Sequence, residues 1–167
     1  MEKILARTLL VLYLLVLIWL VLFKFSFNLS TMLDNQTGLN FIPFAASFGM
    51  DGEINVREIL YNCLFFIPLG LLLGLNFKKI AFKWKLLSIL LLSLAAEVIQ
   101  YVFAIGASDI TDVLTNTLGG FLGLVLYGAC RKFGNDKKLD RIIISAGIVL
   151  FLLFSANIAR LLFDHMR

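Results

Sequence analysis

The sequence contains little charge and few of the residues that build covalent or metal frameworks. Asp, Glu, Lys and Arg make up 16% of its 167 residues, and there are two cysteines, two prolines and one histidine. Two cysteines are too few for a disulfide framework, and one histidine with two cysteines does not form a zinc-binding pattern. We therefore expect no metal site, and the sequence identifies no cofactor.

What the sequence has in excess is apolar surface. Hydrophobic residues make up 60% of the chain and the mean hydropathy is +0.94, whereas soluble domains are about half apolar and about a quarter charged. A soluble protein of this size could not bury so many apolar side chains. The net charge of +4 comes from cations that flank hydrophobic runs, which argues against nucleic acid as a partner. The class is an all-α integral membrane protein.

Five apolar segments approach the length of about 20 residues that a helix needs to cross a bilayer. They predict membrane-spanning helices over about residues 4–23, 58–75, 86–105, 112–130 and 142–163. A long connection over 24–57 joins the first two. We expect residues 1–167 to form a single transmembrane domain. The apolar stretch "GLNFIPFAASF" within that connection is expected to lie at the interface or to re-enter the membrane.

The basic residues are distributed unevenly between the two sides of these spans. Eleven of the fifteen lie at the start of the first span or follow the second and fourth spans: Lys3, Arg7, Lys78, Lys79, Lys83, Lys85, Arg131, Lys132, Lys137, Lys138 and Arg141. Because Lys and Arg are enriched in cytoplasmic loops, this side is predicted to be cytoplasmic. The N-terminus is then cytoplasmic, and the C-terminus and the 24–57 connection lie outside.

Two of the spans resemble one another. Asn55–Gly74 aligns without gaps on Asp109–Gly128, and in both a polar residue, a carboxylate and an asparagine follow at i, i+3 and i+7. This spacing places all three on one helix face. The match suggests a possible parallel repeat, in which spans one and two correspond to spans three and four. Chance similarity between apolar helices is the alternative.

Polar residues inside the spans are the candidates for function. Glu97 lies about 12 Å below the outer end of its span, where a charge costs about 2.5–3.5 kcal/mol on insertion scales. It should therefore face the bundle interior, with Gln100 on the same face. Asn62 and Asn116 lie one turn inside their own spans, at a similar level. A helix–helix hydrogen bond is the structural alternative for Glu97.

Two further carboxylates, Asp109 and Asp112, precede or begin the fourth span. The positive end of the helix dipole favours acids there, and Ser108 is expected to be the N-cap. They either stabilise the helix start or join Glu97 and the amides in one outward-facing polar pocket. Arg160 is either a counter-charge for this acidic cluster or a side chain that extends to the interface.

The stretches "LNFIPF", "EILYNCLFFIPLG", "AAEVIQY" and "GASDITDVLTNTLGGFLG" resemble the VanZ-like family of bacterial membrane proteins, over roughly residues 39–126. The resemblance implies a role connected with low-level resistance to teicoplanin, a glycopeptide that carries a fatty-acyl chain. The motif residues that it implies are Asn40, Pro43, Asn62, Pro68, Gly70, Glu97, Gln100, Asp109, Asp112, Asn116 and Gly119.

The chain departs from the family pattern immediately before the acids. Many members have an arginine in a G-R-S-x-D-like string, but this chain has Gly106, Ala107, Ser108 and Asp109. If that arginine binds an anionic group in relatives, Arg57 or Arg160 would have to replace it here, or the ligand differs.

Three functions follow as hypotheses, all in a bacterial cell membrane with membrane lipids as neighbours. The first is binding of an amphiphile, a glycopeptide antibiotic or a lipid-linked envelope precursor through Asn62, Gln100, Asp109, Asn116, Arg57 and Arg160. The second is an enzyme acting on a lipid-linked precursor, with Glu97 as acid or base and Asp112 holding a cation or the substrate. The third is a small transporter or flippase, which the possible repeat suggests.

Overall fold

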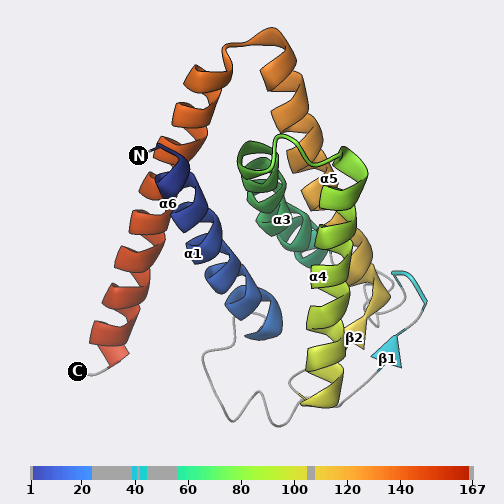
Figure 1. The fold of residues 1–167 in the computed structure, drawn as a ribbon. Coiled ribbons are helices and arrows are strands. Elements are labelled where there is room, and N and C mark those ends of the chain that lie inside the picture. The colour runs from blue at the N-terminus through green and yellow to red at the C-terminus, as the bar shows by residue number, and fades with distance from the viewer. Residues whose placement is uncertain (1, 24–38, 41, 45–55, 105–107, 166–167) are drawn as a thin grey trace.

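The computed structural model describes residues 2–23, 39–40, 42–44, 56–104 and 108–165. These residues contain five long helices: α1 (Glu2–Phe23), α3 (Val56–Asn76), α4 (Phe82–Val102), α5 (Ile110–Phe133) and α6 (Asp136–His165) (Figure 1). All five are long and apolar enough to cross a membrane. The predicted all-α class with five spans is confirmed.

The helices differ from the predicted apolar runs mainly at their ends. Helix α6 begins at Asp136 rather than near residue 142. Its first turns are charged, so they did not belong to the apolar run that predicted the span, but they are helical. Helix α4 begins at Phe82 and ends at Val102 instead of spanning 86–105. Its end is set by Ala104, whose φ of 53° lies in the left-handed region and cannot continue a right-handed helix.

One small strand pair was not expected from the sequence. Strand β1 (Leu39–Asn40) pairs in parallel with β2 (Ser108–Asp109), and Asn40 lies opposite Asp109. The pairing joins the long connection between the first two spans to the start of α5. Most of the expected interfacial stretch of residues 38–48 lies outside the described residues. Phe44, near its middle, donates its backbone N–H to Thr111 Oγ1 at 2.8 Å.

Helices α3 and α5 pack backbone against backbone. A Cβ added to Gly119 would collide with the carbonyl of Cys63, and one added to Gly123 would collide with that of Ile67. Gly70 on α3 faces the same contact. In a bilayer, where lipid tails are as apolar as side chains, such close contact is a principal source of helix association. Glycine at these positions therefore allows the close approach of α3 and α5.

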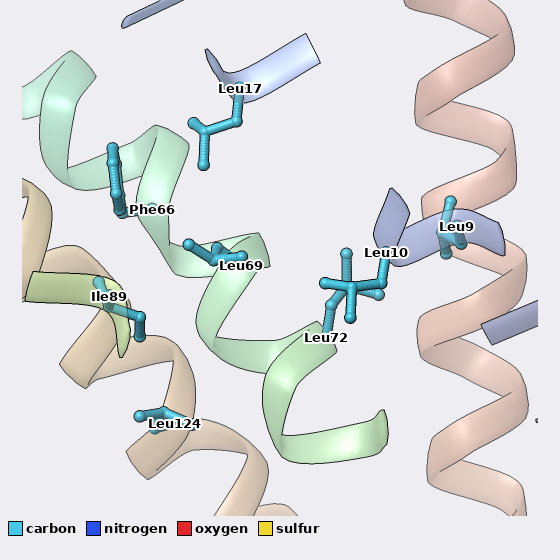
Figure 2. Packing of buried hydrophobic residues seen from close by; sticks show 8 residues of the cluster. All are labelled: Leu9, Leu10, Leu17, Phe66, Leu69, Leu72, Ile89 and Leu124. Carbon is cyan, nitrogen blue, oxygen red and sulfur yellow. The ribbon is translucent and has the colours of Figure 1, made fainter. Parts of the chain in front are cut away.

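An apolar cluster joins α3 and α5 to the other helices. Figure 2 shows Leu10 of α1 and Leu72 of α3 pointing toward one another, with Ile89 of α4 and Leu124 of α5 on the other side of α3. All four side chains are buried. Helix α6 packs against α1, where Leu9 lies against Gly147.

The N-terminus, the α3–α4 connection and the start of α6 meet at one end of the bundle (Figure 1). The strand pair and the end of α1 lie at the other (Figure 1). The structure therefore gathers the basic segments at a single end, as the charge pattern requires. That this end is cytoplasmic stays a prediction, as do the parallel repeat and the single domain.

Candidate functional site

The site is built around Glu97, which α4 places in the protein interior. Its side chain is 3% exposed, and Oε2 accepts a hydrogen bond from the backbone N–H of Asp109 at 2.8 Å. The carboxylate therefore lies at the N-terminal end of α5, where the free N–H groups and the helix dipole stabilise negative charge.

Asp109 is the N-cap of α5. Its backbone is extended (φ −130°, ψ 126°) and Oδ1 accepts from the N–H of Thr111 at 2.7 Å. The prediction that Ser108 caps this helix is wrong, because Ser108 lies one residue earlier, in β2. Asp109 Oδ2 also accepts from Asn40 Nδ2 at 3.2 Å. One carboxylate thus stabilises the helix start and binds the long connection.

Asn40 is positioned by a local turn as well as by the strand pair. Its Oδ1 accepts from the N–H of Ile42 at 3.2 Å, which leaves Nδ2 directed at Asp109. Asparagine commonly stabilises such turns by bonding to the backbone two residues on. The motif residue on the long connection and the motif residue at the helix start therefore meet, 69 positions apart in sequence.

A cavity of about 290 Å³ lies beside these residues. Its polar lining comes from Asn40, Glu97, Tyr101, Ser108 and Asp109, and its apolar lining from Leu94, Val98, Ile110 and Val113. Leu94 is 44% exposed and Val98 is 52% exposed. Both therefore lie on the outer surface of α4, and apolar side chains that line the cavity are also exposed on the surface of the bundle.

The other predicted polar residues are brought together in a separate place, between the helices. Asn62 Nδ2 donates to Asp112 Oδ1 at 2.7 Å, linking α3 to α5. Asn116 Nδ2 donates to Ser93 Oγ at 2.9 Å, linking α5 to α4. Asp112 and Asn116 are buried. Neither pair is among the residues lining the cavity, so the single pocket expected from the sequence is divided into a cavity group and an interior group.

Gln100 shares the buried face of α4 with Glu97, as the i, i+3 spacing predicts. Its side chain is fully buried, and Nε2 donates to the carbonyl of Val21 at 3.0 Å, in the last turn of α1. Carbonyls in a last helical turn have no partner within their own helix. Gln100 thus binds the end of α1 and does not line the cavity.

The two arginines predicted to bind a ligand, of which Arg160 was also the candidate counter-charge, are not among the residues that line the cavity. Arg57 is in the first turn of α3 and Arg160 is near the end of α6, and both side chains are exposed. A role for either arginine in ligand binding stays a prediction.

Sequence reasoning missed several polar residues in the interior group. Ser93, Thr111 and Thr115 are all buried, and Thr115 Oγ1 donates to the Thr111 carbonyl at 2.9 Å. Ser93 precedes Glu97 by four residues and Gln100 by seven, so the helical period would have placed all three on one face. Among the residues that the structure describes, no cluster of three His, Cys, Asp or Glu side chains could hold a metal ion.

Comparison with known proteins identifies similar sequences but no similar solved structure. The model of the VanZ/LLP1 family matches residues 10–131. Protein VanZ of Enterococcus faecium is 54% identical over 154 residues, which cover 92% of this chain and 92% of that protein. No solved structure matches the chain.

Proposed function

The chain belongs to the VanZ/LLP1 family, and on this basis we propose that it contributes to teicoplanin resistance in a bacterial cell membrane. It does so by binding an amphiphile in the cavity beside Glu97 and Asp109. The strand-pair end of the bundle faces the exterior, so the ligand enters from the outer leaflet. Resistance thus results from the binding of this amphiphile at the outer surface of the membrane.

The observation that carries this proposal is the mixed lining of the cavity. The residues that line it include Glu97 and Asp109, which carry carboxylates, and the half-exposed apolar residues Leu94 and Val98. Hydroxyl or amino groups of a ligand would donate to the carboxylates, at about 1.5–3 kcal/mol for each hydrogen bond to a charged group. The attached acyl chain would lie along α4, in contact with lipid.

The volume of the cavity limits which part of a ligand it holds. At about 290 Å³ it is at the lower end of the roughly 300–1,000 Å³ that is usual for sites of drug-sized molecules. A whole glycopeptide is larger than this. The cavity therefore takes the part where a polar headgroup meets an acyl chain, in teicoplanin or in a lipid-linked envelope precursor.

The first test compares inhibitory concentrations of teicoplanin in a susceptible Gram-positive host at matched membrane levels. Glu97→Gln keeps an oxygen that can accept from the Asp109 N–H, so the fold should persist while the charge is lost. Asp136→Asn is the matched control, because Asp136 is a half-exposed carboxylate at the opposite end of the bundle. We expect wild type and the control to raise the inhibitory concentration and Glu97→Gln not to do so.

The second test measures binding directly, with the full-length protein in lipid nanodiscs. Teicoplanin should bind wild type and should bind Glu97→Gln at least about tenfold more weakly, as the loss of one charged hydrogen bond implies. Teicoplanin from which the acyl chain has been removed should bind both poorly. Equal binding to wild type and Glu97→Gln would show that the cavity is not the site. Conversion of a lipid-linked precursor by wild type but not by Glu97→Gln would favour the enzyme hypothesis instead.

A further inference from the structure

A second and larger cavity lies at the opposite end of the bundle from the proposed site. Its volume is about 600 Å³. It is enclosed by the first two turns of α1, by the end of α3 with the α3–α4 connection, and by the first turns of α6. These are the three segments that meet at one end of the bundle in Figure 1. The cavity therefore exists only in the folded bundle, where segments distant in sequence come together.

The charges around this cavity are unbalanced. Five cations line it, namely Lys3, Arg7, Lys78, Lys79 and Lys137, against two carboxylates, Glu2 and Asp140. The lining thus carries three more positive than negative charges. Like charges held together at the edge of a low-dielectric interior repel one another, and an anion placed among them relieves the repulsion.

Both carboxylates are already engaged by cations within the protein. Glu2 Oε1 accepts from Arg141 Nε at 2.7 Å, and Arg141 is not a lining residue. Asp140 pairs with Lys78 Nζ and also accepts from the hydroxyl of Tyr127 at 3.1 Å. Burial acts to lower the pKa of Lys78, but its hydrogen bonds with Asp140 and Tyr127 outweigh that effect and raise the pKa, so Lys78 stays charged.

The remaining cations are available to a ligand. Over the described residues, the structure records no ion pair for Lys3, Arg7, Lys79 or Lys137. Their side chains are exposed at the cavity edge. Ammonium and guanidinium groups in this arrangement bind phosphate oxygens by charge-assisted hydrogen bonds.

The inner part of the same cavity is apolar. Ala6, Leu75 and Ile144 are buried there and belong to one hydrophobic cluster. Phe77 and Ile80, which also line the cavity, are 40% and 43% exposed. Cations at the edge and apolar side chains inside match a molecule in which a phosphate is attached to acyl chains. A soluble phosphate would use only the first of these features.

From these observations we propose that the basic cavity binds the phosphate headgroup of an anionic phospholipid. The site is separate from the cavity beside Glu97, and its occupation does not require that the proposed function be correct. The bound lipid links α1, the α3–α4 connection and α6, and so stabilises the bundle at the end where α6 joins it.

The test uses two triple variants of the full-length protein with the same change in net charge. The cavity variant carries Arg7→Gln, Lys79→Gln and Lys137→Gln. The control variant carries Lys83→Gln, Lys132→Gln and Lys138→Gln, three exposed cations near the same end that do not line the cavity. Because all six side chains are exposed, neither variant removes buried packing. The readout is the rise in unfolding temperature in neutral detergent as lipid is added.

Phosphatidylglycerol is expected to raise the unfolding temperature of wild type and of the control, whereas phosphatidylcholine is not. The half-saturating phosphatidylglycerol concentration should rise about fivefold for each cavity cation removed, and so about a hundredfold in the cavity variant. An equal rise of the half-saturating concentration in both variants would overturn the proposal, since only net charge would then matter. An equal response of wild type to phosphatidylcholine would also overturn it. If inorganic phosphate alone reproduces the stabilisation, the ligand is a soluble phosphate and the lipid is excluded.

Single variants guard against a folding defect in the triple. Lys79→Gln and Lys137→Gln should each raise the half-saturating concentration about fivefold. Their unfolding temperatures without lipid should match that of wild type. A single variant that folds normally and binds phosphatidylglycerol as wild type does would contradict the assignment of that cation to the site.

Discussion

Asn62 on α3 donates a hydrogen bond to Asp112 on α5 at 2.7 Å, although the two residues are 50 positions apart in sequence. In the aligned segments Asn62 corresponds to Asn116 and Glu58 to Asp112. The asparagine of one segment thus binds the carboxylate of the other, across the interface where Gly119 and Gly123 allow the two backbones to approach. The two segments that are similar in sequence are therefore also in direct contact in the structure.

We predict that this hydrogen bond contributes measurable coupling to stability. A double-mutant cycle of Asn62→Ala and Asp112→Ala should give about 0.6 kcal/mol and at most about 1.7 kcal/mol, the average and the maximum found for hydrogen bonds between membrane helices. The free energy of unfolding would be measured by detergent denaturation in mixed micelles. Asn62→Ala combined with Gln100→Ala is the control, because these residues bond to different partners, and its effects should add. A coupling energy of zero between Asn62 and Asp112 would contradict the contact.

The α3–α5 interface should reject any side chain larger than glycine at Gly119. Gly119→Ala places a Cβ against the Cys63 carbonyl and should destabilise by about 1–3 kcal/mol, as overpacking does elsewhere. Gly128→Ala is the matched control on the same helix, since nothing lies within 4 Å of its Cβ position. Alanine there should be neutral or stabilise by up to about 1 kcal/mol through helix propensity. The same unfolding measurement distinguishes them, and equal effects would argue against close packing at Gly119.

Asp109 should contribute to the stability of the fold as a helix cap, whether or not a ligand is bound. Asp109→Ala removes the acceptor of the Thr111 N–H and should cost about 0.5–2 kcal/mol more than Asp109→Ser, because serine also caps well. Serine does not reach Asn40 as the aspartate does. Asn40→Ala should therefore cost less in the Asp109→Ser background than in wild type, because only its turn contact with the Ile42 N–H is left to lose there. An equal loss in both backgrounds would contradict a stabilising contact between Asn40 and Asp109.

The predicted orientation can be tested by chemical labelling of single cysteines. After Cys63 and Cys130 are replaced by alanine, Ser108→Cys should react with a membrane-impermeant maleimide on intact cells. Lys79→Cys should react only once the membrane is permeabilised. The reverse pattern would place the Glu97 cavity on the cytoplasmic side of the membrane and would exclude entry of its ligand from the outer leaflet.

Local pattern in the sequence was enough to predict the class of fold and the position of most buried polar groups. Apolar runs of helical length predicted five spans, because a helix satisfies its own backbone hydrogen bonds in lipid. The 3.6-residue period placed Glu97 and Gln100 on one face, and both are buried. The distribution of Lys and Arg predicted which segments share an end, and they do meet there.

Only the tertiary structure decided which partner each of these groups has. Helical spacing gives the direction of a side chain relative to its own axis, but not the rotation or depth of the neighbouring helix. Gln100 therefore binds α1 and Asn62 binds Asp112, while Glu97 and Asp109 line the cavity. The pairing of Asn40 with Asp109 depends on a strand contact of two residues on each side, too short for any periodic pattern in the sequence to predict.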